Sequence, residues 1–213
     1  MAVVSTWSGV GVSMQSALAA AKTITAITKA SPAVATSTAH GYTNGQEIKL
    51  TVQGMVQLDG RVVRAANVTA NTFELEGIDS TLFDTFTAGT AELVTFGTTF
   101  NVFTDVNGSG GDFSFIDTTT IHATVKSQVP GVANPITFTF GALWDPADAG
   151  LIAAKVASDS KAQRCFKLAW PSGRKAMFVG YIGAALAPAG QAQDKVTTQV
   201  VVTAFGALTA YAT

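Results

Sequence analysis

Apolar and polar residues alternate with a period of two along much of the chain, a pattern typical of half-buried β-strands. In residues 47–53, EIKLTVQ, the apolar residues occupy every second position. The same alternation predicts strands over residues 121–126, 135–140 and 166–170. Threonine, a β-branched polar residue that suits strands, fills many of the intervening positions. The pattern therefore predicts a mainly β fold.

Residues 145–161 show helical spacing instead. Asp145 is placed as an N-cap before Pro146 at the first helical position, and the helix is expected to end near Lys161. An apolar stripe predicts that one side of this helix lies on a sheet. The stripe consists of Ala149, Ile152, Ala153 and Val156. The ALAAAK stretch at residues 17–22 is a second candidate, for a short helical turn.

Charge and turn signals separate a middle segment from the rest of the chain. Residues 25–95 hold seven acidic and four basic residues, whereas residues 96–213 hold seven acidic and eight basic ones. Within 25–95, turn signals such as Asn44-Gly45 and Asp59-Gly60 recur at the roughly 8–12-residue intervals of a small barrel or sandwich. We predict a small β module at 25–95, inserted into a discontinuous β domain made of residues 1–24 and 96–213.

The chain is poor in charge. Charged residues make up 13% of its 213 residues, about half of the roughly 25% usual for soluble proteins, and 47% are hydrophobic. This composition predicts that much of the surface is hidden by partners. The formal net charge is -1, so the chain lacks the basic patch with which proteins grip nucleic acid.

Few residues are suited to catalysis or metal binding. The bases available to a nucleophile are His40, in a turn before glycine, and His122, at a polar position of a predicted strand, and we interpret both as structural. The chain has neither a GxSxG elbow, a phosphate-binding glycine loop nor an HExxH pair. Cys165 is the single cysteine, which excludes an intramolecular disulfide and a structural zinc site. We expect no enzyme activity, metal or cofactor.

The stretch DVNGSGGD at residues 105–112 resembles a calcium loop superficially, but Ile116 stands where such a loop has a bidentate Glu. We interpret it as a flexible loop between strands. The tryptophans, Trp7, Trp144 and Trp170, are expected to pack in a core or an interface rather than to form a carbohydrate platform.

The N-terminal segment does not have the pattern of a secretory signal. Lysine and arginine are absent before Lys22, and glycine and serine interrupt the apolar run. No stretch approaches the ~18 consecutive apolar residues of a membrane-spanning helix. We expect a soluble protein that is made in a cytoplasm and has no membrane anchor.

Several segments follow one another in a recognisable order from Phe96 to the end of the chain. They are IDTTTIH (116–122), KSQVPG (126–131), PITFTF (135–140), WDPADAGL (144–151), FKLAWPSG (166–173), FVGYIGAA (178–185) and APAGQAQDKVTTQVVVTAFGAL (187–208). In this order they resemble the tail tube proteins of phages with long, non-contractile tails. The middle segment resembles a small β module of phage tail and virion proteins. Its markers are AHGYTNGQ (39–46), GMVQLDGR (54–61) and NTFELEGID (71–79).

The resemblance implies a β-sandwich or barrel-forming domain with one α-helix, plus the inserted small barrel or sandwich. It also implies a structural subunit in the virion, made in the host bacterial cytoplasm, with six copies per ring and rings stacked into a tube. If each copy gives four strands, 24 strands at ~4.8 Å spacing and ~40° tilt make a circumference of roughly 150 Å and leave room for a DNA duplex. The implied partners are further copies, the tape-measure, tail terminator and distal tail proteins, and passing double-stranded DNA.

The resemblance also leads to predictions about individual segments. Residues 112–131 are expected to include the ring-to-ring contact. The predicted contact residues are Asp112, Asp117, Thr118, Thr119, Lys126, Gln128, Pro130 and Gly131. The helix is expected on the outer side of the barrel, and the module is expected to project outward and to be dispensable for polymerisation. Lysine or arginine in the channel would bind phosphates, so we expect a neutral or mildly acidic lining.

Two other functions fit the sequence. In one, the chain is a receptor- or carbohydrate-binding tail module whose acidic segment, residues 25–95, binds the ligand. In the other, it is the inner tube of a contractile tail. Of the functions considered, an enzyme is the least favoured hypothesis.

Overall fold

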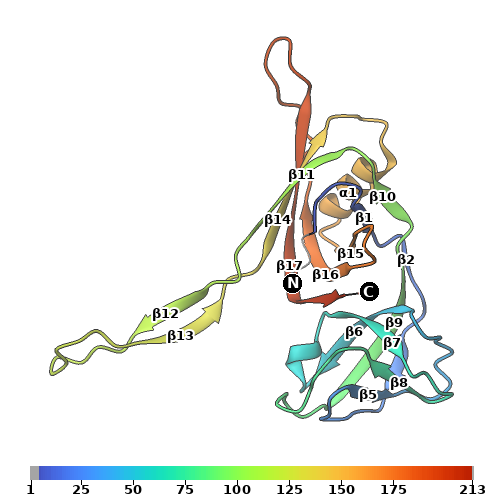
Figure 1. Cartoon of the computed structure of the whole chain (residues 1–213), viewed down its shortest axis with the longest axis vertical. Helices are drawn as coiled ribbons and strands as arrows, with labels where there is room; N and C mark the ends of the chain where they lie inside the picture. The colour runs from blue at the N-terminus through green and yellow to red at the C-terminus, as the bar shows by residue number, and fades with distance from the viewer. Residues whose placement is uncertain (1–4, 213) are drawn as a thin grey trace.

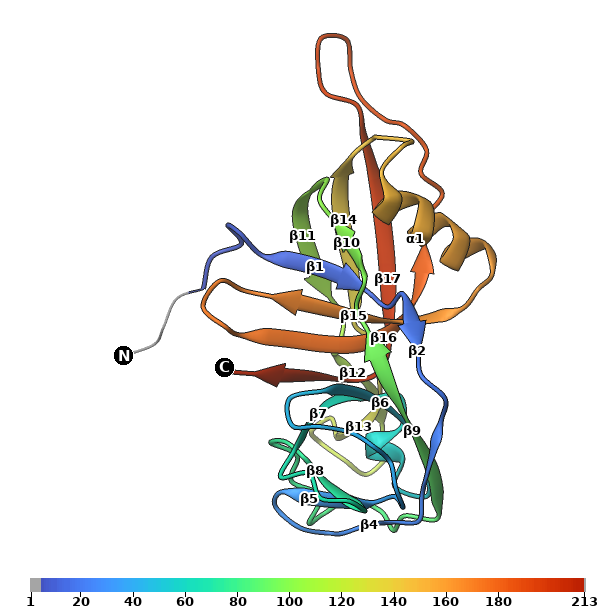
Figure 2. The same cartoon turned by 90° about the vertical axis from the view of Figure 1, so that its right-hand side faces the viewer.

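A computed structural model describes residues 5–212, and its strands form two antiparallel sheets and a separate hairpin. The first sheet, sheet A, curls into a half-barrel (Figures 1 and 2). Its seven strands are, in spatial order, β10 (Thr98–Phe100), β1 (Gly11–Met14), β15 (Gln163–Ala169), β16 (Lys175–Gly183), β17 (Thr197–Tyr211), β14 (Thr137–Leu143) and β11 (Phe103–Ser109). The expected mainly β fold is confirmed, and the predicted strands at 135–140 and 166–170 lie in β14 and β15.

One side of sheet A holds an apolar core in which aromatic rings stack across the strands. The rings of Phe138 and Phe178 lie 4.6 Å apart between centroids, and those of Phe166 and Phe178 lie 5.4 Å apart. The helix α1 (Ala149–Asp159) covers this core with the buried side chains of Leu151 and Ala154. Burial of every second residue in β14 explains why alternation in the sequence was informative there.

The helix was predicted at the right place but with the wrong start. Its N-cap is Asp148, whose Oδ1 accepts the Leu151 backbone N–H at 2.9 Å. Asp145 does not cap the helix, because its own Oδ1 accepts the Ala147 N–H and closes a turn just before it. The element therefore begins at Ala149 rather than at Pro146.

The predicted apolar stripe of this helix was also wrong. Gly150, Leu151 and Ala154 are buried, whereas Ile152 and Val156 are exposed by 49% and 60%. The cause is a close approach to β10: a Cβ on Gly150 would lie 2.7 Å from the Thr99 carbonyl oxygen. Leu151, Ala154 and Ala157 face the sheet beside Gly150, whereas Ile152 and Val156 point outward.

The second sheet, sheet B, spans residues 17–95 and has its own core. Its strands are, in spatial order, β2 (Ala17–Leu18), β9 (Ala88–Thr95), β6 (Glu47–Gln53), β7 (Val62–Ala66), β8 (Thr72–Leu75), β5 (Ala33–Thr36) and β4 (Ala26–Ile27). A further strand, β3 (Lys22–Ile24), also pairs with β9. The 3-10 turn η1 (Val56–Leu58) follows β6. The predicted strand at 47–53 is β6. The helical turn expected at residues 17–22 is wrong, because this segment pairs with β9 through β2 and β3.

Sheets A and B share a packed interface. Val62 and Val94 of sheet B form one buried cluster with Cys165, Met177 and Val179 of sheet A. Removing residues 25–95 would expose the sheet A side of this cluster. Whether the module is dispensable for polymerisation stays a prediction, and an excised protein will need polar residues at these sites.

Polar contacts reinforce this interface. The Glu47 carboxylate on β6 forms ion pairs with two lysines of sheet A, Lys167 at 2.7 Å and Lys175 at 3.4 Å. The Tyr211 hydroxyl accepts the Arg64 backbone N–H at 2.7 Å. Burial raises the pKa of Tyr211, so the phenol stays protonated at neutral pH.

The hairpin, which we call the arm, consists of β12 (Phe113–Asp117) and β13 (Gln128–Ala133) and projects away from both sheets (Figure 1). The strand predicted at residues 121–126 is wrong: this segment is the turn at the tip of the arm, where the Ala123 N–H donates to the Thr120 carbonyl at 3.0 Å. The flexible loop expected at 105–112 is also only partly right, since residues 105–109 belong to β11. Within residues 5–212, no helix is long and apolar enough to cross a membrane.

We expect Glu47→Gln to lower the free energy of unfolding by about 1–2 kcal/mol, because it removes the charge that faces two lysines across the interface. Urea denaturation measures this change. Asp159→Asn is the control, since it breaks the exposed Lys155–Asp159 pair of α1 and is expected to cost below about 0.5 kcal/mol. Equal losses in the two variants would contradict the role given to Glu47.

Candidate assembly interface

The arm brings together all the contact residues predicted from the sequence. Asp112 lies at its base, Asp117 ends β12, and Gln128, Pro130 and Gly131 lie in β13. The remaining three, Thr118, Thr119 and Lys126, lie in the tip. These residues are exposed apart from Gly131, which is half-buried because a Cβ there would meet the Ser114 carbonyl oxygen at 2.9 Å. No partner chain is present, so their role in contacts stays a prediction.

The tip of the arm is held by its own polar groups. The Asp117 carboxylate accepts the Thr119 backbone N–H at 2.8 Å, and hydrogen bonds from Thr119 hold the pKa of Asp117 below its ordinary value. Across the hairpin, the Thr118 N–H donates to the Ser127 carbonyl at 2.9 Å. Asp117 and Thr119 therefore shape the tip, which is a role that the sequence did not reveal.

The sequence analysis missed the apolar side chains of the arm. They are exposed in the free chain, and they are Phe113, Phe115, Ile116, Ile121, Val125, Val129 and Val132. Phe115 is opposite Pro130 and Ile116 is opposite Val129, so the two pairs lie on opposite faces of the hairpin. The sequence does show these apolar residues among polar ones. At residues 121–126, however, their alternation was interpreted as a half-buried strand instead of an exposed surface.

Two glycines set the direction of the arm. Gly110 and Gly111 have φ of 91° and 85°, in the left-handed region that favours glycine. A Cβ on Gly110 would also lie 2.2 Å from the Pro135 carbonyl oxygen. Between these glycines and Pro135 the chain leaves β11 and β14 and starts a separate sheet.

A polar, nearly uncharged face covers one side of β11, β14 and β17. These strands turn alternate residues away from the apolar core, in the cross-strand rows Asn107–Thr139–Val201, Ser109–Thr137–Thr203 and Asp105–Gly141–Gln199. Asp105 is the charged residue among these nine. We call this surface the polar face. It has few groups that would hold a phosphate or a cation.

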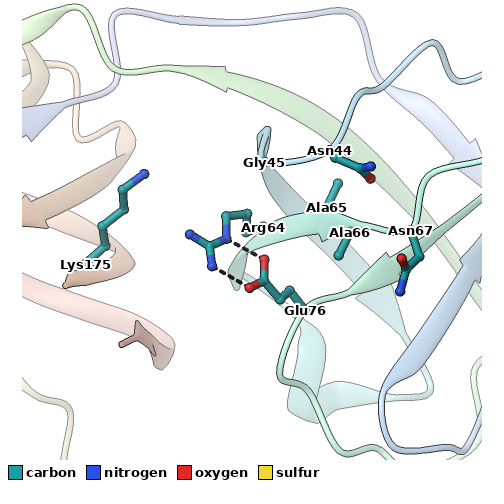
Figure 3. A pocket seen from close by; sticks show the side chains of 8 residues that line it. All are labelled: Asn44, Gly45, Arg64, Ala65, Ala66, Asn67, Glu76 and Lys175. Carbon is teal, nitrogen blue, oxygen red and sulfur yellow. Dashed lines mark hydrogen bonds and ion pairs between the residues drawn. The ribbon is translucent and has the colours of Figure 1, made fainter. Parts of the chain in front are cut away.

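A pocket of about 520 Å³ lies between the two sheets (Figure 3). Arg64 forms a two-point ion pair with Glu76, and Lys175 approaches from sheet A. The pocket is lined by Asn44, Gly45, Arg64, Ala65, Ala66, Asn67, Glu76 and Lys175. Because Arg64 and Lys175 each face a carboxylate, of Glu76 and Glu47, we interpret the pocket as a hydrated junction between the sheets.

The groups considered for catalysis lie apart. His40 is buried, and its Nδ1 accepts the Tyr42 N–H at 3.0 Å, whereas His122 lies at the tip of the arm. Cys165 is buried, and burial raises its pKa to about 12. In the part of the chain that the structure describes, His, Cys, Asp and Glu side chains form no group of three that could hold a metal ion.

The tryptophans give a mixed result. The Trp170 ring lies 5.5 Å from that of Trp7, and Trp7 is half exposed. The Trp144 indole N–H donates to the Leu186 carbonyl at 3.0 Å. Trp170 packs against the core of sheet A, whereas Trp144 is 38% exposed.

Comparison of the sequence with protein-family models matches most of the chain to a family model. The model, described as "Phage tail tube protein, TTP", covers residues 53–213, about three quarters of the chain. The chain belongs to the phage tail tube protein family. A search of curated proteins found no match. The tail tube protein is thus a structural part of the virion whose copies assemble into a tube.

The match begins earlier in the chain than the tail tube resemblance seen in the sequence, which starts at Phe96. It begins in β6, so it includes β7, β8 and β9 of sheet B as well as everything after Phe96. The second half of sheet B thus falls inside the tail tube family match, in agreement with the packed interface between the two sheets.

The Arg64–Glu76 pair makes the stability of the tail tube protein depend on pH. Hydrogen bonds from Arg64 hold the pKa of Glu76 below its ordinary value of 4.5. The pair therefore contributes fully above about pH 4.5, and this contribution is lost as the pH falls through the lowered pKa. We expect Glu76→Gln to unfold more easily than the unaltered protein at pH 7, with a smaller difference near pH 3. Urea denaturation at both pH values checks this, and a constant difference would contradict it.

Proposed function

We propose that this tail tube protein forms hexameric rings that stack into the DNA-conducting tube of a phage with a long, non-contractile tail. The observation that carries the proposal is the arm. A two-stranded hairpin is marginally stable in water by itself, and this one exposes apolar side chains on both faces. A neighbouring subunit of the tube would supply the surface that the arm lacks.

The edges of sheet A support the ring. β10 and β11 are its edge strands, and open edges favour pairing with another chain unless they are closed off. The polar face spans the three strands next to one of these edges, β17, β14 and β11. In the proposed ring, pairing at these edges would continue the sheet from copy to copy, and four strands from each of six copies would give a circumference of roughly 150 Å.

The polar face is suited to the channel. A lining of threonine, asparagine and glutamine with one aspartate per subunit is neutral to mildly acidic and offers phosphates no ion pairs. We propose that this face lines the tube, that the tape-measure protein occupies the channel during assembly, and that the tail terminator and distal tail proteins close its ends. Double-stranded DNA passes through without sequence-specific contacts. The subunits are synthesised in the host bacterial cytoplasm.

Deleting the arm is expected to give folded subunits that form no tubes. Asp112 and Asn134 are already joined by a hydrogen bond from the Asn134 N–H to the Asp112 carbonyl, at 2.8 Å. An Asn-Gly turn can therefore replace residues 113–133. Negative-stain microscopy of concentrated protein would show tubes for the intact chain only.

Thermal unfolding is expected to be nearly unchanged, because the three core clusters contain no residue of 113–133. Normal tubes without the arm would refute this role.

A positive charge on the polar face is expected to trap DNA inside the tube. Thr139→Lys places an ammonium in the middle of β14, and six copies per ring would hold phosphates at low salt. Short duplexes should sediment with these tubes and resist nuclease. Leu82→Lys is the control, since Leu82 lies on a turn of the module proposed to face outward, and DNA held there should be digested. Nuclease-sensitive DNA on the Thr139→Lys tubes would contradict the placement of the polar face.

A further inference from the structure

A small apolar groove lies beside α1. Its volume is about 210 Å³, below the roughly 300–1,000 Å³ of typical small-molecule sites, so it fits a few aliphatic side chains better than a ligand. The groove is lined by Trp144, Asp145, Pro146, Leu151, Ile152, Lys155, Val156 and Leu186. Its floor and walls are thus mostly apolar, with charge confined to Asp145 and Lys155.

The groove is held in shape before any partner binds. The Trp144 indole N–H donates to the Leu186 carbonyl, and the Trp144 backbone N–H donates to the Val196 carbonyl, both at 3.0 Å. Lys155 forms an ion pair with Asp159, one turn further along the helix. A preformed apolar groove loses little conformational entropy on binding, which favours association.

The outer side of α1 is unusual for a surface helix. Ile152 and Val156 are one turn apart and largely exposed, although the opposite side of the helix already packs on sheet A. A helix with apolar residues on both sides is expected to be covered on both sides. The outer side of α1 is therefore an apolar surface of the kind that a partner covers.

The tip of the arm carries side chains that match it. Ile121 is 96% exposed and Val125 is 77% exposed, and they lie in the same closed turn at the end of the arm. The stretch from Gly111 to His122 spans roughly 35 Å when extended. The tip lies far from α1 of its own chain, on the other side of sheet A (Figure 1).

We propose that the arm tip of one subunit inserts Ile121 and Val125 into the α1 groove of a second copy of the chain. This proposal rests on the proposed function and names the surface that receives the arm. Self-assembly of the family makes a second copy the natural occupant. Because tip and groove lie on different sides of the subunit, the contact is head-to-tail and can repeat without closing, as a stack of rings requires.

Charge also favours this contact. Lys126 follows Val125 in the tip and is the charged residue nearest to the inserted side chains. Asp145 stands at the rim of the groove. Docking of the tip would bring the ammonium towards the carboxylate while the aliphatic groups leave water, and the removal of apolar surface from water favours association.

Three matched variants of the full chain test the proposal. Val156→Glu alters the groove, Val125→Glu alters the tip, and Leu82→Glu is the control at a position that is 94% exposed in sheet B. Each replaces an exposed aliphatic side chain with a carboxylate, so we expect unchanged thermal unfolding. We expect at least a tenfold decrease in the protein pelleted as tubes for the first two variants, and none for the control.

Cross-linking gives a second measurement that does not depend on blocking assembly. Cys165 is buried and its pKa is raised to about 12, so it does not compete with introduced thiols. With Val125→Cys and Val156→Cys in the same chain, a short bifunctional thiol reagent is expected to give a ladder of linked subunits. Val125→Cys combined with Leu82→Cys is expected to give none.

The outcomes separate this inference from the proposed function. If the unaltered protein forms no tubes when concentrated, the proposed function is refuted and the inference falls with it. If tubes form and only Val125→Glu blocks them, or if the ladder appears with Leu82→Cys instead of Val156→Cys, the tip docks elsewhere. The inference is then overturned, while the tube remains.

Discussion

A two-stranded hairpin has two faces and no interior, so it cannot shield apolar side chains with its own atoms. The arm of this tail tube protein carries Phe115 and Ile116 on opposite faces, and both are exposed in the single chain. Removing such side chains from water requires another molecule on each side. The low charge of the sequence has the same origin, because surfaces that become buried between subunits are depleted of charge. The arm and the composition both indicate a subunit that is completed by its neighbours.

The body of the subunit meets a different requirement. Sheet A has its helix-covered core on one side and divides its other side between sheet B and the polar face. Glu47 and the cluster around Val62 and Met177 hold sheet B against sheet A. The pocket around Arg64 fits this picture as a hydrated junction with paired charges.

The sequence predicted what depends on local pattern and failed where distant contacts decide. The strands around Leu50 and Phe138 were found because their alternate residues are buried in the same chain. The helix starts later than predicted because Asp145 closes a turn before it, and its buried side differs from the predicted stripe because Gly150 lies close against β10. Residues 121–126 alternate like a half-buried strand, yet they form an exposed tip. Alternation indicates which residues avoid water, but it does not tell whether their own chain or another one covers them. For the same reason the polar residues of the arm were predicted as contacts, while its apolar ones were missed.

The single thiol of the chain has a consequence for a particle that leaves its cell. A tail tube contains many copies of one subunit, so any reactive group would be repeated along its length. Cys165 lies under sheet B in a place where the thiolate, the form that oxidants attack, is scarce at neutral pH. We therefore expect this thiol to stay reduced when the tail passes from reducing to aerated surroundings.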